Sequence, residues 1–246
     1  ILVDVVDAEK GTFAPTIVAT GTVQPVEDVT LSPLVSGQII RRDPAFTPGG
    51  FVKKGEVLLQ IDPSDYRNTL ELRKSELLQS ETALATEMGR QQIAEQDLQL
   101  INNDSLFGDN PLSDNETQLV LRQPQLNAVK ATIEAARASK NQAQLNLERT
   151  TIRAPFDAHI LSQNVTVGSQ VAQGDNLGRI VGTDSYWVTA TVPVSRLQYL
   201  KFPESNTEKG SIVHIENSSA WPSGAQRVGY LDRQIGALDN QTRLAR

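Results

Sequence analysis

A twelve-residue pattern occurs twice in this chain, on either side of a long stretch with few turn residues, and it limits the possible folds more than any other feature. Residues 47–58 and residues 166–177 both read T-x-G-x-x-V-x-x-G-[ED]-x-L. Residues 31–40 and 152–161 also correspond to each other. Such repetition indicates one duplicated β unit. Each half must bury an apolar face, so we expect residues 29–61 and 148–182 to pack together as one small β-sandwich.

The stretch between the two halves is predicted to be helical. Only two of the 16 Gly and two of the 12 Pro lie between Arg67 and Arg149. Glycine and proline interrupt regular elements, so their depletion over this length favours long helices. The start of the first helix is predicted at residues 62–65, because Asp62 is a good N-cap and Pro63 suits the first helical position.

Heptad spacing predicts that two helices fold back on each other as a coiled-coil hairpin. In the first helix, leucines recur at every seventh residue, at Leu70, Leu77 and Leu84. In the second helix, the a-like heptad positions are Leu119, Leu126, Ile133, Lys140 and Leu147, and the d-like positions are Val129, Ala136 and Ala143. A turn cluster lies at residues 102–111, and Ser113 with Glu116 forms a capping box. Pro124 should kink the second helix or move its start downstream.

The flanks of the chain are predicted to be β structure. Residues 16–20 and 186–192 are β-branched runs of the kind found in strands, and residues 193–200 are expected to form a short helix. The fold class is therefore mainly β with an α-helical coiled-coil hairpin inserted in a split β-sandwich.

Composition excludes several classes of protein. Acidic side chains outnumber basic ones, 29 to 23, and the formal net charge is −6, so the basic surface of a general nucleic-acid binder is absent. The chain has no cysteine, which excludes disulfides, thiolate metal sites and thiol catalysis. No apolar run reaches the roughly 18 residues of a membrane span. These features fit a mature extracytoplasmic protein.

Four segments carry a resemblance to a known family: V-S-G-Q-I at 35–39, G-x-x-V-K-K-G-E-x-L at 49–58, Q-I-D-P-S-D-Y at 60–66, and L-E-R-T-T-I-R-A-P-F-D-A at 147–158. The split sandwich resembles a biotinyl/lipoyl domain. With the inserted hairpin, the chain resembles a periplasmic adaptor, or membrane fusion protein of the HlyD-like family, of tripartite efflux pumps. It is most similar to the resistance-nodulation-division (RND) subgroup.

The resemblance implies four domain segments. Residues 1–10 would be the remnant of a membrane-proximal domain. Residues 11–28 and 185–246 would form an antiparallel β-barrel domain, truncated at its C-terminus, and the tail at 238–246 resembles the family's motif near the last barrel strand. Residues 29–66 and 148–184 would form the lipoyl-like domain, and residues 67–147 would form the hairpin.

The resemblance also implies the partners. Such an adaptor links an inner-membrane transporter, here of RND type, to an outer-membrane channel, for export of drugs or other small molecules. It self-associates into a ring, commonly a hexamer. It lies in the periplasm and is anchored to the inner membrane, here by a segment absent from this chain. No nucleic acid is expected as a partner.

Two groups of residues are candidate functional sites. The resemblance places Leu106, Phe107 and Ser113 at the hairpin tip, as contacts to the channel. The family's tip often has an Arg-Leu pair, and Asn102 and Asn103 stand there instead. We expect Asp62, Pro63, Arg149 and Gly182 to act as hinges, the first three at the hairpin base and Gly182 at the junction with the barrel.

Enzymatic chemistry is not expected. The sequence predicts no catalytic residue, no cofactor and no metal site. His159 and His214 lie in predicted strands, with His214 facing solvent, and Met88 is the one methionine, which is too few soft ligands for a copper exporter.

Three other functions remain as alternatives. An adaptor of an ABC-type or type I secretion exporter would share the fold. A biotin or lipoyl carrier subunit would present a lysine at the turn that joins its two halves, whereas Lys53 and Lys54 lie inside the first half. A coiled-coil scaffold without a transport role is the third alternative.

Overall fold

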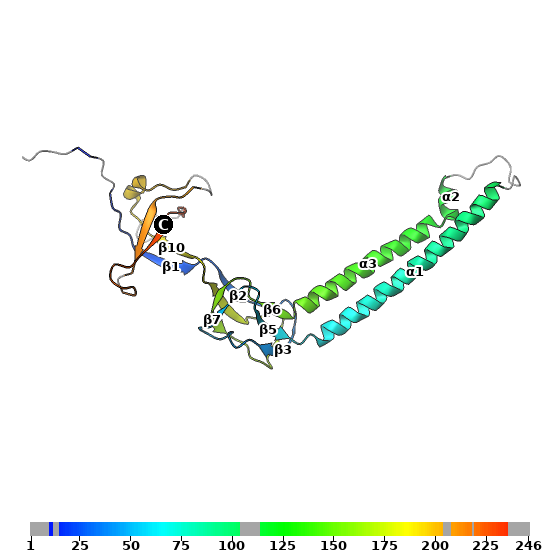
Figure 1. The fold of residues 1–246 in the computed structure, drawn as a ribbon, viewed down its shortest axis with the longest axis horizontal. Coiled ribbons are helices and arrows are strands. Elements are labelled where there is room, and N and C mark those ends of the chain that lie inside the picture. The colour runs from blue at the N-terminus through cyan, green and yellow to red at the C-terminus, as the bar shows by residue number, and fades with distance from the viewer. Residues whose placement is uncertain (1–9, 12–14, 104–113, 204–207, 218, 236–246) are drawn as a thin grey trace, which may run out of the picture. The chain divides into compact units, whose positions relative to one another are not determined.

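The computed structural model describes residues 10–11, 15–103, 114–203, 208–217 and 219–235. It divides into two compact units, residues 27–184 and residues 1–26 with 185–246. Figure 1 shows their elements. The predicted assignment of the chain to four domain segments stays a prediction.

The first unit contains the predicted β-sandwich, and its two halves are interleaved. Its strands are β2 (Asp28–Leu31), β3 (Gly37–Arg42), β4 (Phe51–Val52), β5 (Val57–Ile61), β6 (Thr151–Arg153), β7 (Ala158–Gln163), β8 (Gln170–Val171) and β9 (Gly178–Gly182). One sheet has the order β2-β9-β7-β4 and the other β6-β5-β3-β8, with antiparallel neighbours throughout. Each sheet takes two strands from each half of the sequence, so neither half has a complete sheet without the other.

The repeated turns have the same backbone geometry in both halves. Gly55 has a φ of 83° and its counterpart Gly174 a φ of 90°, values that glycine adopts at little cost. The next residue caps the turn in each copy: the Glu56 carboxylate accepts the Lys53 N–H at 2.8 Å, and the Asp175 carboxylate accepts the Ala172 N–H at 2.7 Å. The G-[ED] dipeptide of the repeat therefore forms the same type of turn in both halves of the sandwich.

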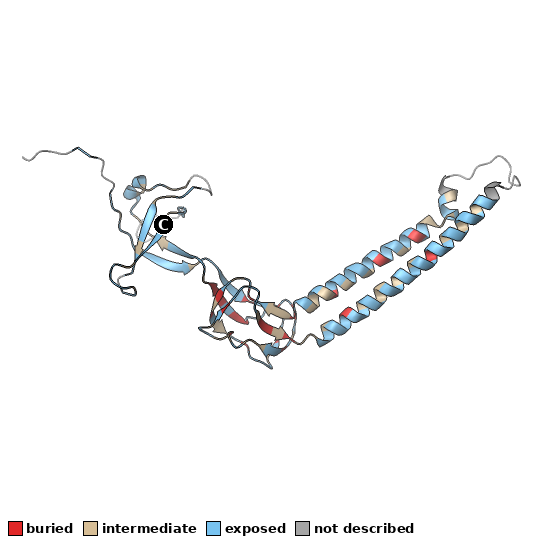
Figure 2. Ribbon diagram, in the orientation of Figure 1, coloured by how far each residue is buried: buried red, intermediate tan, exposed pale blue. Residues whose placement is uncertain are grey.

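One apolar core fills the space between the sheets. Its most buried members are Ile39, Phe46, Leu58, Leu59, Ile61, Ile160, Leu177 and Ile180. Figure 2 shows this burial concentrated in the strands of the sandwich. Repeat partners such as Leu58 and Leu177 are both fully buried, as expected when two halves close on each other.

The hairpin consists of α1 (Ser64–Asn103), the short α2 (Asp114–Val120) and α3 (Gln123–Glu148). Figure 1 shows α1 and α3 side by side. The predicted heptad seam is confirmed where the two helices pair, because Leu70, Leu126, Ile133 and Ala143 are buried. The expectation that Pro124 moves the helix start downstream is also confirmed, because α3 begins only at Gln123.

One seam position was predicted wrongly. Leu119 is 60% exposed, because the chain breaks between α2 and α3 and the heptad does not continue across the break. The residue at the break, Arg122, has a left-handed backbone with a φ of 56°. The heptad spacing did not predict this break, because Leu119 and Leu126 are seven residues apart whether or not the helix continues between them.

The second unit has two antiparallel ribbons. β1 (Gly21–Pro25) pairs with β10 (Tyr186–Ala190), and β11 (Ile212–Glu216) pairs with β12 (Gln226–Tyr230). Among the described residues these ribbons represent the predicted barrel. The short helix predicted at 193–200 is a 3₁₀ helix at Val194–Tyr199. The strand predicted at 16–20 is wrong: the strand begins at Gly21, the first residue that has a partner in β10.

None of the described helices combines the length and the low polarity that a bilayer span requires.

Candidate functional site: the helical hairpin and its base

The predicted channel contacts Leu106, Phe107 and Ser113 lie outside the described residues. Their role at the tip therefore stays a prediction. The candidate site that the structure does describe is the body of the hairpin and its base.

The two chain segments at the hairpin base are hydrogen-bonded to each other. The Ile61 N–H donates to the Thr150 carbonyl at 2.8 Å. The Gln60 amide donates to the same carbonyl at 3.2 Å and to Thr150 Oγ1 at 3.1 Å, while Thr151 Oγ1 donates to Gln60 Oε1 at 2.9 Å. Thr150 is 1% exposed, so loss of a partner there would leave a buried polar atom unsatisfied. We call Gln60, Thr150 and Thr151 the base clamp.

The start of α1 is fixed to the sandwich at two points. The Asp62 N–H donates to the Gln38 carbonyl at 2.8 Å, and the Tyr66 hydroxyl donates to the Ser36 carbonyl at 2.7 Å. The hydroxyl and the N–H of Ser64 both donate to Asp62 Oδ1, at 2.6 and 3.0 Å. These hydrogen bonds hold the pKa of the Asp62 carboxyl below its ordinary value. Asp62 therefore caps the start of α1 with its side chain, but one residue earlier than predicted: α1 begins at Ser64, and Pro63 lies at the N-cap position rather than at the first helical position.

The other predicted hinge residues also have defined positions. The carbonyl of Pro63 accepts the first hydrogen bond of α1. Arg149 is the C-cap of α3, and its side chain is exposed. Gly182 ends β9, and its N–H donates to the Glu27 carbonyl at 2.8 Å. A Cβ at Gly182 would lie 2.8 Å from Glu27 Oε2, so a larger residue there would require the exposed Glu27 side chain to shift. Their role as hinges stays a prediction.

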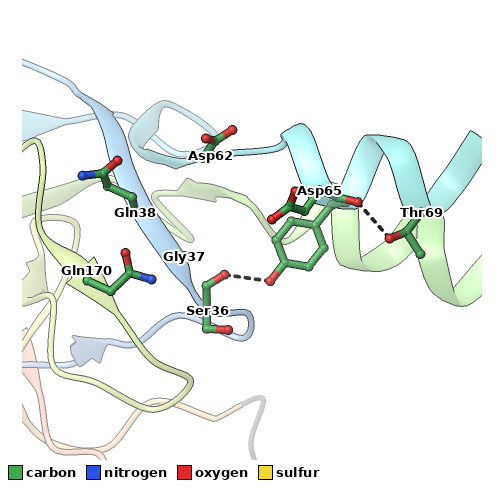
Figure 3. Close-up of a pocket in the computed structure, with 8 residues that line it drawn as sticks. Ser36, Gly37, Gln38, Asp62, Asp65, Thr69 and Gln170 are labelled. Carbon is green, nitrogen blue, oxygen red and sulfur yellow. Dashed lines mark hydrogen bonds between the residues drawn. The ribbon is translucent and has the colours of Figure 1, made fainter.

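A crevice of about 500 Å³ lies where α1 meets β3 and β8, as Figure 3 shows. Its polar lining includes Gln38, Gln170 and Tyr66 and the carboxylates of Asp62 and Asp65. The residues that line it include no basic side chain. Pockets for drug-sized molecules are mainly apolar, so this lining suits a cation better than a drug.

An ion pair that sequence reasoning missed holds the helix break against α1. The Arg122 guanidinium donates from Nε to Glu87 Oε1 at 2.7 Å, and Glu87 is buried. The Arg122 hydrogen bond lowers the pKa of the Glu87 carboxyl, and Arg90 at 3.6 Å adds a smaller effect in the same direction. Glu87 follows Leu84 by three residues, at a seam position. An acidic residue there was the available signal that a basic partner would face it.

The residues weighed for other chemistry lie in turn or strand positions. Lys53 and Lys54 are exposed in the turn between β4 and β5. The halves of the sandwich are joined by the hairpin, so neither lysine lies at a junction between them. The His159 ring stacks on Phe51 with centroids 4.5 Å apart, and His214 is exposed in β11 as predicted. Across the described residues, no group of three or more His, Cys, Asp or Glu could hold a metal ion.

Comparison with solved structures finds this architecture elsewhere. MacA from Actinobacillus actinomycetemcomitans has a TM-score of 0.64 at 20% identity, over 93% of this chain and 70% of that chain. A MacA–MexA chimera that contains the Pseudomonas aeruginosa MexA α-hairpin domain has a TM-score of 0.54 at 18% identity, over 90% and 68%. At these identities the likeness shows the fold alone.

Sequence comparison finds relatives that are longer than this chain. Multidrug resistance protein MdtA of Klebsiella pneumoniae is 27% identical over 226 residues, which cover 91% of this chain and 52% of that protein. MdtA of Escherichia coli K12 is 32% identical over 166 residues, which cover 68% and 37%. The chain thus spans about half or less of the curated relatives it matches.

A family model adds the decisive match. The model described as the barrel-sandwich hybrid domain of RND MFP, the membrane fusion proteins of that transporter class, matches residues 27–183. These residues are the interleaved sandwich together with the hairpin inserted in it. Because the match covers more than half of the chain, this protein belongs to the RND membrane fusion protein family of periplasmic adaptors.

Proposed function

We propose that this chain is part of a periplasmic adaptor that links an inner-membrane RND transporter to an outer-membrane channel for export of drugs or other small molecules. The observation that carries the proposal is the duplicated sandwich with a long hairpin inserted between its halves, within the segment that the family model matches. The MdtA relatives are multidrug resistance proteins by name, which supports drugs as the substrate class.

The role is mechanical rather than enzymatic. α1 has 40 residues, and at about 1.5 Å per residue such a helix reaches about 60 Å. The base clamp joins the entering and leaving segments, so the two helices would move together as one lever. Asp62, Pro63 and Arg149 lie at the base of this lever, where α1 starts and α3 ends. Gly182 is the last residue of β9, where the chain leaves the sandwich. We propose these residues as the positions where the lever changes angle.

In this proposal the tip, with Leu106, Phe107 and Ser113, meets the outer-membrane channel, and the β1 and β10 region meets the transporter. The adaptor lies in the periplasm, anchored at the inner membrane, and assembles as a ring, taken to be a hexamer. It holds no cofactor and catalyses no reaction.

Photocrosslinking in cells tests the tip assignment. A photoreactive amino acid replaces Leu106 in the full-length protein, and the captured partner is identified by mass spectrometry. We expect an outer-membrane channel. The matched control carries the same group at Gln173, which is exposed in a sandwich turn and should not capture the channel. Capture of only a soluble enzyme at Leu106 would contradict the adaptor function.

A second probe at Trp187 in β10 distinguishes transporter classes. Capture of an RND transporter is expected there. Capture of an ABC-type exporter instead would establish the alternative that shares this fold.

Deletion of residues 68–147 separates an adaptor from a carrier or a scaffold. An adaptor should lose efflux while the sandwich still folds, because both sheets are built from residues outside the deletion. Unchanged efflux would exclude a spanning role for the hairpin. A covalently modified lysine in protein isolated from its native cell would favour the carrier alternative.

Locking the hairpin base tests whether the proposed hinge residues move during efflux. A disulfide engineered across the hairpin base should reduce efflux under oxidising conditions, and reduction should restore it. Full efflux in the locked protein would argue against a lever that moves.

A further inference from the structure

The packing of the hairpin changes at the ion pair of Glu87 and Arg122. Between this pair and the sandwich, the helices bury Leu70, Leu126, Ile133 and Ala143. We use "distal segment" for the residues on the other side of the pair, 88–103 of α1 and 114–121, which include α2. No side chain that the structure describes in the distal segment is buried. Figure 2 shows α2 and the facing end of α1 without a buried residue.

The distal segment has little packing of its own. Its large apolar side chains on α1, Met88, Ile93 and Leu100, are each more than half exposed. Its first seam position, seven residues after Leu84, is Gln91 rather than a leucine. α2 has only seven residues, and a helix of that length is not stable by itself in water. The distal segment therefore needs a contact that holds it in place.

Arg122 supplies such a contact. Its backbone joins α2 to α3, because the Arg122 N–H donates to the Leu119 carbonyl at 3.1 Å and the Leu126 N–H donates to the Arg122 carbonyl at 3.0 Å. Its side chain crosses to α1, where Nε donates to Glu87 Oε1 at 2.7 Å. One residue thus connects all three helices at the point where the packed seam ends.

An ion pair at this point can open more easily than an apolar contact. Separation of Glu87 and Arg122 returns both charges to water, and the hydration they regain offsets much of the attraction they lose. The next seam residues toward the sandwich are Leu84 and the buried Leu126, and their separation would expose apolar surface to water. An opening that starts in the distal segment should therefore stop at Glu87.

We propose that the Glu87–Arg122 pair is a latch for the distal segment. When the latch is closed, Arg122 holds α2 against α1 and sets the direction of α2. When it is open, the distal segment separates as a unit while the rest of the hairpin stays packed, as local openings do where few apolar contacts are buried. Glu87 and Arg122 are then positioning residues for the tip. This positioning role rests on the proposed adaptor function, whereas the latch itself does not.

Hydrogen exchange of the full-length protein, measured by mass spectrometry, tests the latch. Arg122→Gly removes the guanidinium but keeps the break between the helices, because glycine adopts a φ of 56° readily. We expect exchange in the distal segment to become about tenfold faster. Exchange in α1 before Glu87 and in α3 after Leu126 should not change. An equal increase along the whole hairpin, or no increase, would overturn the latch.

Arg90→Gln is the matched control. Arg90 also lies near Glu87, at 3.6 Å, but both residues belong to α1. This substitution therefore removes a positive charge near Glu87 without separating two helices, and exchange in the distal segment should change by less than about twofold. An increase as large as that in Arg122→Gly would mean that the charge near Glu87 matters rather than the link between helices, and the latch would be wrong.

A double-mutant cycle tests whether Glu87 and Arg122 act through each other. Glu87→Ala alone should also speed exchange in the distal segment, because it removes the acceptor of the Arg122 guanidinium. The double variant, Glu87→Ala with Arg122→Gly, should exchange no faster than Arg122→Gly alone, because the latch is already lost. Effects that multiply in the double variant would mean that the two residues act independently, which contradicts a latch.

Photocrosslinking from Leu106 separates the latch from the adaptor function. In cells that produce the full-length protein, Arg122→Gly should lower capture of the outer-membrane channel, and Arg90→Gln should leave it unchanged. Unchanged capture in Arg122→Gly would overturn the positioning role. Faster exchange confined to the distal segment, in a protein that captures no channel even as wild type, would support the latch and count against the adaptor function. Channel capture with uniform exchange would support the adaptor function and overturn the latch.

Discussion

The sandwich and the hairpin lie in the same compact unit, yet they are held together in different ways. The sandwich buries one continuous cluster of apolar side chains, many of them fully inaccessible. The hairpin seam is thinner: it buries Leu70, Leu126, Ile133 and Ala143, and also the charged Glu87. Figure 2 shows the contrast, with burial concentrated in the strands and mostly exposed helices.

This difference indicates a division of labour. A dense core gives the sandwich one packing arrangement, because interiors at crystal-like density tolerate little change. Two long helices joined by a narrow seam depend on the base clamp and on the Glu87–Arg122 pair for their alignment. The hairpin is therefore the part of the unit that can gain most from contacts with other molecules.

The largest effect is expected from the sandwich core. Leu58→Ala should destabilise the sandwich by about 3 kcal/mol, because Leu58 is fully buried and the cavity would not refill. Leu77→Ala in the half-buried seam should cost about 1 kcal/mol. Hydrogen exchange measured by mass spectrometry reports the loss of stability separately for the sandwich strands in Leu58→Ala and for the hairpin helices in Leu77→Ala. Equal losses of protection would contradict the contrast between core and seam.

The next effect is expected at the base clamp. Thr150→Val keeps the shape of the side chain and removes the hydroxyl that donates to the Leu147 carbonyl and accepts from Gln60. The loss of these two hydrogen bonds should cost about 1 kcal/mol, because the Leu147 carbonyl and the Gln60 amide keep their other partners. It should appear as faster exchange in β5 and β6. Thr132→Val, on the exposed surface of α3, is the control and should change little.

Much of this organisation was predictable from the sequence because the signals were periodic. The repeat at 47–58 and 166–177 predicted a two-part sandwich, and heptad leucines predicted a hairpin. Both signals reflect burial of regularly spaced side chains. The interleaving of strands was not contained in the repeat, since strand order depends on which edges meet in three dimensions.

The repeated turns should respond equally to substitution. Gly55→Ala and Gly174→Ala each add a Cβ that meets no atom within 4 Å, so the cost comes only from the left-handed backbone and should be about 1 kcal/mol. Gly89→Ala in α1 also meets no atom, but there alanine should stabilise the helix by about 1 kcal/mol. Thermal unfolding of the three variants checks the opposite signs.

The parts that sequence reasoning missed are single contacts rather than patterns. Leu119 kept the heptad spacing but lies beyond the break at Arg122, because one left-handed residue redirects a helix whatever the spacing. The partner of Glu87 could not be identified either, since Arg122 lies 35 residues later in the sequence and only the hairpin fold brings the two together.

A smaller effect is expected when Glu87 is protonated. Its pKa is lowered in the folded chain, so the pair stabilises the hairpin above the ordinary carboxyl pKa of 4.5 and the stabilisation is lost as the pH falls below that value. Because Arg122 is partly exposed, solvent weakens the pair. Far-ultraviolet circular dichroism should show a loss of helix stability below about pH 4.5.

Glu87→Gln is the control for this pH dependence, since it keeps the shape of the side chain and cannot titrate. Its helix stability at pH 7 should match that of the wild type at low pH. An unchanged acid response in Glu87→Gln would assign the effect to other carboxylates.

The smallest effect on folding is expected on the exposed side of α1. Thr82→Lys places a charge where the side chain faces solvent and should change stability by less than about 0.5 kcal/mol. The same lysine at Ser80, a half-buried seam position, should lower the melting temperature clearly, because its charge would be partly desolvated without a partner. Thermal unfolding of the two variants compares the two sides of one helix. Equal melting temperatures would show that the seam at Ser80 accepts a charge as readily as a solvent-facing position, and the contrast between the packed and the exposed side of α1 would then be lost.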